Sequence, residues 1–106
     1  MGKVFHDSII VTSFDDTMID EAHTFAKETF GQQVTSIVTS PVNGYFTFVI
    51  TPDGSKEGWS ESDKGDENRK AFLDWVETKA YEDGSNCLEV GQIRYGSDWK
   101  LELEDA

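Results

Sequence analysis

Residues 40–75 decide the fold, and they read SPVNGYFTFVITPDGSKEGWSESDKGDENRKAFLDW. The Asn43-Gly44 pair is typical of a tight hairpin turn. It precedes the run with the strongest strand propensity in the chain, residues 45–51. A loop rich in Gly, Ser and charge follows, and the apolar spacing then predicts an amphipathic helix over residues 67–81. We expect the other elements to be arranged around the strand at 45–51.

The flanking segments complete a β-α-β-β-α-β-β order. Apolar runs and alternation predict a helix at residues 18–30 and strands at residues 4–12, 34–39, 86–95 and 99–103. Thr17, with Asp20 three residues later, resembles a capping box for the first helix. In the strand 86–95 the alternation changes phase at Gly91, which predicts a β-bulge there.

This order predicts a single α+β domain over residues 1–106. The expected fold is a ferredoxin-like β-α-β-β-α-β sandwich with an added C-terminal β-hairpin strand and an antiparallel sheet that carries both helices on one face. The opposite face is expected to be apolar enough for a dimer interface or a covered ligand face. The residues that could lie on it are Tyr45, Thr47, Val49, Cys87, Trp99 and Leu103.

The strongest compositional feature is charge, with 21 acidic against 9 basic residues and a formal net charge of −12. Such a field repels phosphate backbones, so direct nucleic-acid binding is disfavoured. Three explanations remain open: solubility alone, attraction to a basic protein surface, and cation binding.

No apolar run reaches the length of a membrane span, and the N-terminus lacks the apolar core of a signal peptide. Cys87 is the one cysteine, so no internal disulfide is expected. With only His6 and His23 beside it, too few soft ligands are present for a structural zinc site. His23 is expected to be a solvated surface residue. These features indicate a cytoplasmic protein without a metal or cofactor.

Four motifs resemble functional motifs but differ from them in residue type or spacing. Residues 43–50 resemble the aromatic strand of RNA-recognition domains, but the leading residue is not basic and the spacing is one residue too long. The loop at residues 13–16 is acidic, which excludes the arginine cradle of acylphosphatases. Residues 53–56 lack the spacing of a phosphate loop and read as a turn.

The fourth motif is the acidic run at residues 61–68, which suggests calcium. Counted as an EF-hand loop from Asp63, it has Gly65 at position 3, Asn68 at position 6 and Asp74 at position 12, so two essential residues are missing. The structural interpretation is that Ser62 or Asp63 caps the second helix.

Trp59 is the strongest candidate for a functional residue, because it stands in a loop that has few apolar side chains to bury its ring. It serves either as a loop anchor or as an aromatic contact for a partner. The full set of candidate binding residues is Trp59, Lys56, Asp53, Tyr45 and Asp63. Neither histidine lies in a recognisable pattern with a nucleophile, so no catalytic residue is predicted.

The segment SPVNGYFTFVITPDGSKEGWSESD, with the helix after it and the YEDGS turn, resembles a family of small uncharacterised acidic proteins of bacteriophages and prophages. The resemblance implies an accessory role in the bacterial cytoplasm by binding a host factor. The leading hypothesis is a non-enzymatic protein that binds a basic, nucleic-acid-handling host protein. The alternative is a small-molecule binder that uses the sheet face and the loop 53–66, as a homodimer.

Overall fold

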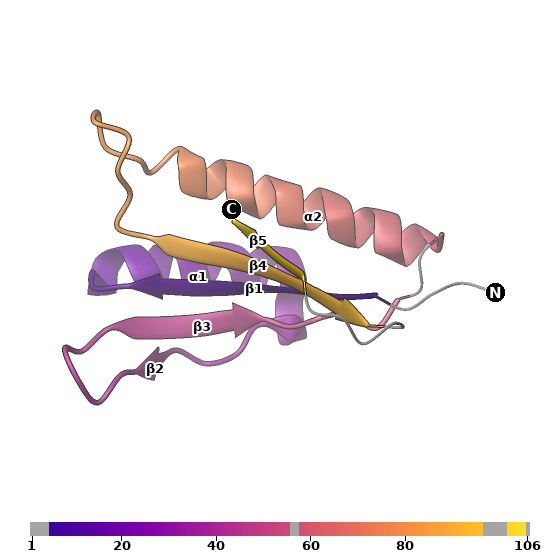
Figure 1. Ribbon diagram of the computed structural model, residues 1–106, viewed down its shortest axis with the longest axis horizontal. Helices are drawn as coiled ribbons and strands as arrows, with labels where there is room; N and C mark the ends of the chain where they lie inside the picture. The colour runs from indigo at the N-terminus through magenta and orange to yellow at the C-terminus, as the bar shows by residue number, and fades with distance from the viewer. Residues whose placement is uncertain (1–4, 56–57, 97–101, 106) are drawn as a thin grey trace.

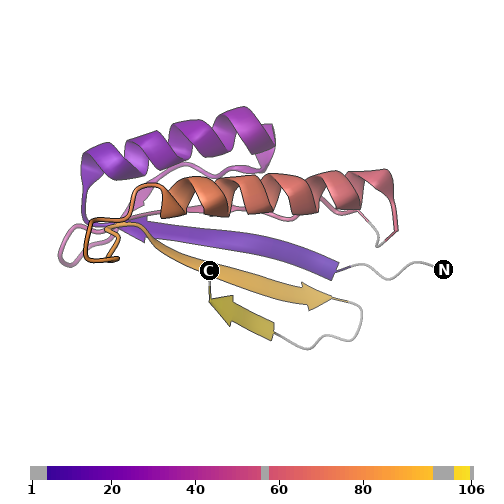
Figure 2. The same cartoon turned by 90° about the horizontal axis from the view of Figure 1, so that it is seen from above.

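The computed structural model describes residues 5–55, 58–96 and 102–105. Its strands are β1 (Phe5–Ser13), β2 (Val38–Thr39), β3 (Phe46–Ile50), β4 (Glu89–Gly96) and β5 (Glu102–Asp105). They form one antiparallel sheet in the order β2-β3-β1-β4-β5. Helices α1 (Asp16–Phe30) and α2 (Ser60–Glu77) cover the same face of the sheet, and a short 3₁₀ helix, η1 (Gly31–Gln33), follows α1 (Figures 1 and 2).

The architecture is therefore α+β, with two helices on an open antiparallel sheet, and the strand order is compatible with a ferredoxin-like arrangement. The central strand is β1, because it pairs with β3 on one side and β4 on the other. The expectation that residues 45–51 form the central strand is wrong, because β3 lies beside the central strand β1. Ile9 and Val11 of β1 have no exposed surface, as their continuous apolar run predicts.

The β2–β3 hairpin turns at Asn43 and Gly44, whose φ angles are 64° and 62°. This positive φ at both positions is what the Asn-Gly pair predicts. The alternation in β3 is also confirmed. Phe48 and Ile50 are buried beneath the helices, whereas Val49 lies on the other face.

Strand β4 runs without interruption past Gly91, which stands opposite Ile10 of β1. The predicted bulge is therefore absent. The change of phase in the sequence has another cause, because Gln92 and Arg94 occupy the side of the strand that faces the helices. Ile93 consequently lies on the open face of the sheet.

Helix α1 begins two residues earlier than predicted, and its cap is Asp15. Asp15 has extended backbone angles, and its Oδ1 accepts a hydrogen bond of 3.0 Å from the backbone N–H of Met18. Thr17 already lies inside the helix, so it cannot serve as the predicted cap.

Helix α2 covers residues 60–77 and not the predicted 67–81. Its first turns carry Ser62 and Gly65, which are buried and continue the inward stripe of Phe72 and Val76. Small residues at these positions look like loop in the sequence, yet they allow the helix to pack closely. Ser62 and Asp63 therefore lie within the helix and do not cap it, and the predicted loop 53–66 ends at Trp59.

The core lies between the sheet and the two helices. Its members are Ile9, Val11, Ile19, Ala22, Ala26, Phe30, Val34, Phe48, Ile50, Phe72, Val76, Cys87 and Leu88. Cys87 belongs to this core, so its expected place on the open face is wrong. His23 is also not a solvated residue: its Nε2 donates to the carbonyl of Thr35 at 2.8 Å, and its ring meets Phe48 edge-on at 5.1 Å.

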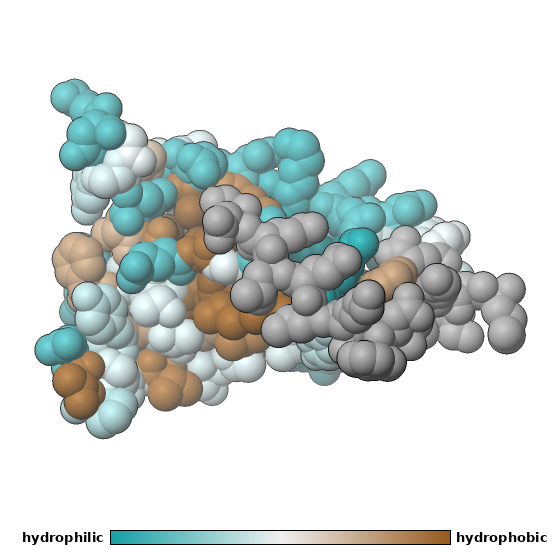
Figure 3. Space-filling view, in the orientation of Figure 1, coloured by the Kyte–Doolittle hydropathy of each residue, from teal (hydrophilic) through white to brown (hydrophobic). Residues whose placement is uncertain are grey.

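The open face of the sheet carries apolar side chains at its middle, as Figure 3 shows. Ile10, Val49 and Ile93 lie there, and each is partly exposed. Leu103 is paired with Ile93 in the register, whereas Trp99 lies outside the described residues. The expectation of an apolar second face is therefore confirmed for β1, β3 and β4.

Candidate functional site

Two of the predicted binding residues, Asp53 and Trp59, line one cleft of about 370 Å³. Trp59 immediately precedes α2 and is 48% exposed. The rest of the lining comes from the end of α1, the following loop segments and the first turns of α2: Phe30, Gln33, Gly54, Ser55, Glu61, Lys64, Gly65 and Asn68. Within the described ranges no strand residue lines this cleft. The prediction of one pocket that joins this loop to the open sheet face is therefore wrong.

Asp53 is fixed by its own turn and by α2. Its Oδ1 accepts hydrogen bonds from the backbone N–H and the hydroxyl of Ser55, at 2.8 and 2.7 Å. Its Oδ2 approaches Gly65 so closely that a Cβ on Gly65 would lie 2.9 Å away. Partial burial raises the pKa of Asp53, but the hydrogen bonds from Ser55 and the nearby Arg69 guanidinium outweigh burial and leave the pKa below its ordinary value.

The other predicted binding residues do not join this cleft. Tyr45 precedes β3 and Asp53 follows it, so the two residues stand at opposite ends of that strand. Asp63 is exposed in the first turn of α2 and is not part of the lining. Lys56 lies outside the described residues.

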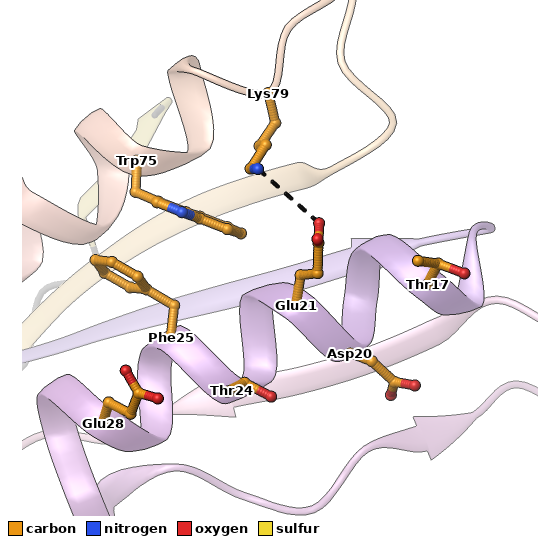
Figure 4. A pocket seen from close by; sticks show the side chains of 8 residues that line it. All are labelled: Thr17, Asp20, Glu21, Thr24, Phe25, Glu28, Trp75 and Lys79. Carbon is orange, nitrogen blue, oxygen red and sulfur yellow. Dashed lines mark ion pairs between the residues drawn. The ribbon is translucent and has the colours of Figure 1, made fainter.

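A second hollow, which we name the interhelical groove, lies between α1 and the end of α2 and has a volume of about 510 Å³ (Figure 4). Its lining consists of Thr17, Asp20, Glu21, Thr24, Phe25, Glu28, Trp75 and Lys79. Glu21, Phe25 and Glu28 are spaced four and three residues apart, so they share one face of α1. The groove is therefore an aromatic surface bordered by carboxylates.

The floor of the interhelical groove is the stacked pair Phe25 and Trp75, with ring centroids 5.1 Å apart and planes inclined by 19°. Lys79 reaches over this floor, its Nζ 5.2 Å from the centre of the Trp75 ring and 4.0 Å from Oε2 of Glu21. Figure 4 shows Lys79 and Glu21 pointing toward each other across the gap between the helices. Among the described residues, Asp20 and Glu28 have no ion-pair partner.

Sequence reasoning missed the interhelical groove because it assigned Phe25 and Trp75 to the buried stripes of their helices. Both are only partly buried and pack against the edge of the core. The available signal was the pair of glutamates on the same helical face as Phe25, which marks that face as the border of the apolar stripe.

An ion-pair network joins the sheet to α2 at the opposite end of the molecule from the hairpin. Arg94 of β4 donates from Nε to Oδ1 of Asp7 at 2.8 Å, and Arg69 of α2 lies 3.4 Å from Oδ2 of the same carboxylate. Arg69 also pairs with Asp66, one turn earlier in α2. The side chains of Arg69 and Asp7 are 13% and 19% exposed. This low exposure gives the network a structural role.

In the described parts of the chain, no group of three or more His, Cys, Asp or Glu side chains is arranged to hold a metal ion. Neither of the helices described here combines the length and apolarity needed to cross a membrane.

A scan against protein-family models and a search of curated proteins found no match to this chain.

Proposed function

We propose that this chain is a non-enzymatic acidic interaction protein of bacteriophage or prophage origin that binds a basic host protein in the bacterial cytoplasm. The observation that carries this proposal is the interhelical groove, where Glu21 and Glu28 border the aromatic floor of Phe25 and Trp75. A basic side chain fits such a surface, because its alkyl stem packs on a ring while its charge meets carboxylates. The net charge of −12 adds attraction at long range.

The strength of such a complex depends on several contacts together. Exposed ion pairs contribute about 0–1 kcal/mol each, and an exposed cation over an aromatic ring contributes about 0.5–1 kcal/mol. Salt screens these terms, since the Debye length is only about 8 Å at physiological ionic strength. We therefore expect fast association and a steep loss of affinity with added salt.

The positions of His23 and Cys87 support the non-enzymatic part of the proposal. His23 is engaged with a backbone carbonyl and an aromatic ring, and Cys87 is buried in the core. Both therefore have structural roles. We also propose that the fold is ferredoxin-like, with β5 as the added strand, and the strand order β2-β3-β1-β4-β5 supports this assignment.

The direct test uses a fluorescent lysine-rich peptide, with the acetyl-lysine form of the same peptide as a neutral control. We expect the lysine form to bind at low salt and to be released as salt rises, and the acetylated form not to bind. The double variant Glu21→Gln and Glu28→Gln should weaken binding several-fold. Its matched control removes two exposed carboxylates outside the groove, Glu67 and Glu82, and should have a smaller effect. Equal losses of peptide affinity in both double variants would contradict the proposal that the groove is the binding site.

Affinity purification from bacterial lysate with the wild type and the groove variant would then identify the partner by mass spectrometry. Trp59→Ala in the same series tests whether the cleft residue adds a specific contact. Recovery of the same proteins by the wild type and the groove variant would count against the proposal.

A second candidate function is small-molecule binding in the cleft of Asp53 and Trp59. Two features favour it: the cleft volume of about 370 Å³, and the carboxylate of Asp53 in the lining, whose Oδ1 accepts two hydrogen bonds from Ser55. Ligand-observed NMR against pooled small amines and nucleosides, with Trp59→Ala as control, tests it. Sedimentation equilibrium tests the homodimer that belongs to this alternative, with the apolar open face as its interface.

A further inference from the structure

We infer that the interhelical groove contains a lysine-binding subsite, formed by the ring of Trp75 and the carboxylate of Glu21. Lys79 fills this subsite in the free protein, and a lysine side chain of the basic partner takes its place in the complex. The inference rests on the proposed function and adds to it the class of side chain that is recognised and an internal competitor.

The side chain of Lys79 occupies the subsite through two weak contacts, one with the Trp75 ring and one with the Glu21 carboxylate. Its Nζ lies 5.2 Å from the centre of the Trp75 ring, within the range of about 6 Å over which a cation is attracted to an aromatic face. It lies 4.0 Å from Oε2 of Glu21, at the outer limit of an ion pair. The side chain of Lys79 keeps 32% of its surface exposed and that of Glu21 keeps 50%. Water can therefore replace these contacts when Lys79 moves away.

The subsite itself does not depend on Lys79. The Trp75 ring is stacked on Phe25 and lies 6.2 Å from the ring of Phe72, which is fully buried. Glu21 is carried by α1, whose position is fixed by the buried residues of the same helix. Lys79 lies two residues beyond the end of α2, and its backbone N–H donates a hydrogen bond to the carbonyl of Val76 at 3.0 Å. Only its flexible side chain has to leave.

The surroundings favour a cation over an anion, and the position of Lys79 shows that an ammonium group reaches the site. Asp20 and Glu28 add carboxylates to the border of the groove, so anions are repelled. The groove volume of about 510 Å³ leaves space beside Lys79 for an incoming side chain. The occupant to which these features point is a lysine on a protein surface, because neighbouring basic residues of the same partner meet the rest of the acidic surface.

The test compares Lys79→Gln with Lys70→Gln, using the fluorescent lysine-rich peptide as the probe. Lys70 is exposed on α2 and pairs with Asp74 at 2.8 Å, so each substitution removes one positive charge and releases one carboxylate. Removing an internal competitor raises the fraction of protein that is ready to bind, and we expect Lys79→Gln to tighten binding roughly three- to tenfold beyond Lys70→Gln. Equal affinities of the two variants, or weaker binding by Lys79→Gln, overturn the subsite.

A second readout follows Lys79 in the wild-type protein. The side-chain methylene protons of Lys79 should be shifted by the ring current of Trp75 and should move to ordinary lysine positions when the peptide is added. Unchanged shifts at saturating peptide would contradict the displacement. If the wild type binds the peptide but the two lysine variants agree, the proposed function stands and the subsite fails. If the wild type does not bind the peptide, the proposed function fails as well.

Discussion

Gly65 of α2 and Asp53 of the preceding loop are in such close contact that a methyl group on residue 65 would lie 2.9 Å from Oδ2 of Asp53. The same methyl group would lie 3.2 Å from Nη1 of Arg69. Gly65 is thus the point at which a carboxylate meets the helix surface, and its lack of a side chain makes that approach possible.

Gly65→Ala should therefore raise the free energy of unfolding by less than the gain of about 1 kcal/mol usual for alanine over glycine in a helix, because the side-chain ends of Asp53 and Arg69 have to shift. The same substitution combined with Asp53→Ala should restore that gain, because the atom closest to the new methyl group is absent. Urea unfolding of the wild type, the two single variants and the double variant measures this coupling. Simple additivity of the two changes would show that the contact does not matter.

The lowered pKa of Asp53 predicts a pH-dependent contribution to stability. A carboxyl group whose pKa is lower in the folded than in the unfolded state stabilises the fold above its unfolded pKa, about 3.9, and loses this effect as the pH falls through the folded value. Asp53→Asn should therefore be less stable than the wild type at neutral pH, and the difference should shrink in acid. Chemical denaturation across this pH range tests the sign, with Glu67→Gln, an exposed position, as control.

Asp7 links the sheet to α2 through its ion pair with Arg69. Asp7→Asn should therefore lower the free energy of unfolding by about 1–3 kcal/mol. The loss leaves the largely buried Arg69 with one carboxylate partner among the described residues, Asp66, and weakens the hold on Arg94. The matched control is Asp74→Asn, which breaks the exposed pair with Lys70 and should change stability by less than about 0.5 kcal/mol. Similar losses in the two variants would contradict a structural role for Asp7.

Asp15→Ala should destabilise the protein by about 1 kcal/mol, because the backbone N–H of Met18 loses its acceptor. Thr17→Ala is the informative comparison, since the sequence pattern assigns the cap to Thr17 and the structure does not. Thermal unfolding of both variants distinguishes the two assignments. A larger effect at Thr17 would support the capping box instead.

Local sequence patterns predicted the elements whose signals are strong and short. The hairpin at Asn43 and Gly44 needs only two residues with positive φ, and the alternation of β3 is set by its own side chains. The order of helices and strands followed from the same kind of signal. What these patterns could not give was the central strand, because strand neighbours are decided by packing of the whole chain.

The start of α2 was missed for a physical reason. Its inward stripe passes through residues 62, 65, 69, 72 and 76, a helical spacing in which only the last two residues are large and apolar. Ser62 and Gly65 are both buried, and Gly65 is approached closely by Asp53 of the preceding loop, a contact that composition does not reveal. The loop assignment of residues 53–66 therefore failed over its second half.

The candidate site was predicted in part. Asp53 and Trp59 do line one cleft, as their closeness in sequence suggested, but the predicted sheet face is not connected to it. The interhelical groove joins residues that are fifty or more positions apart, Glu21 with Lys79 and Phe25 with Trp75. A single sequence shows each of these residues but does not show which of them are in contact.

The chain has two arginines, Arg69 and Arg94, and Asp7 contacts both of them. A guanidinium is the group best shaped to grip a phosphate with two parallel hydrogen bonds. An anion that captured Arg69 would have to compete with the contact that joins α2 to the sheet, and an anion that captured Arg94 would have to compete with a contact between β4 and β1. A variant that gained affinity for phosphate at these arginines would therefore be expected to lose stability in the same step.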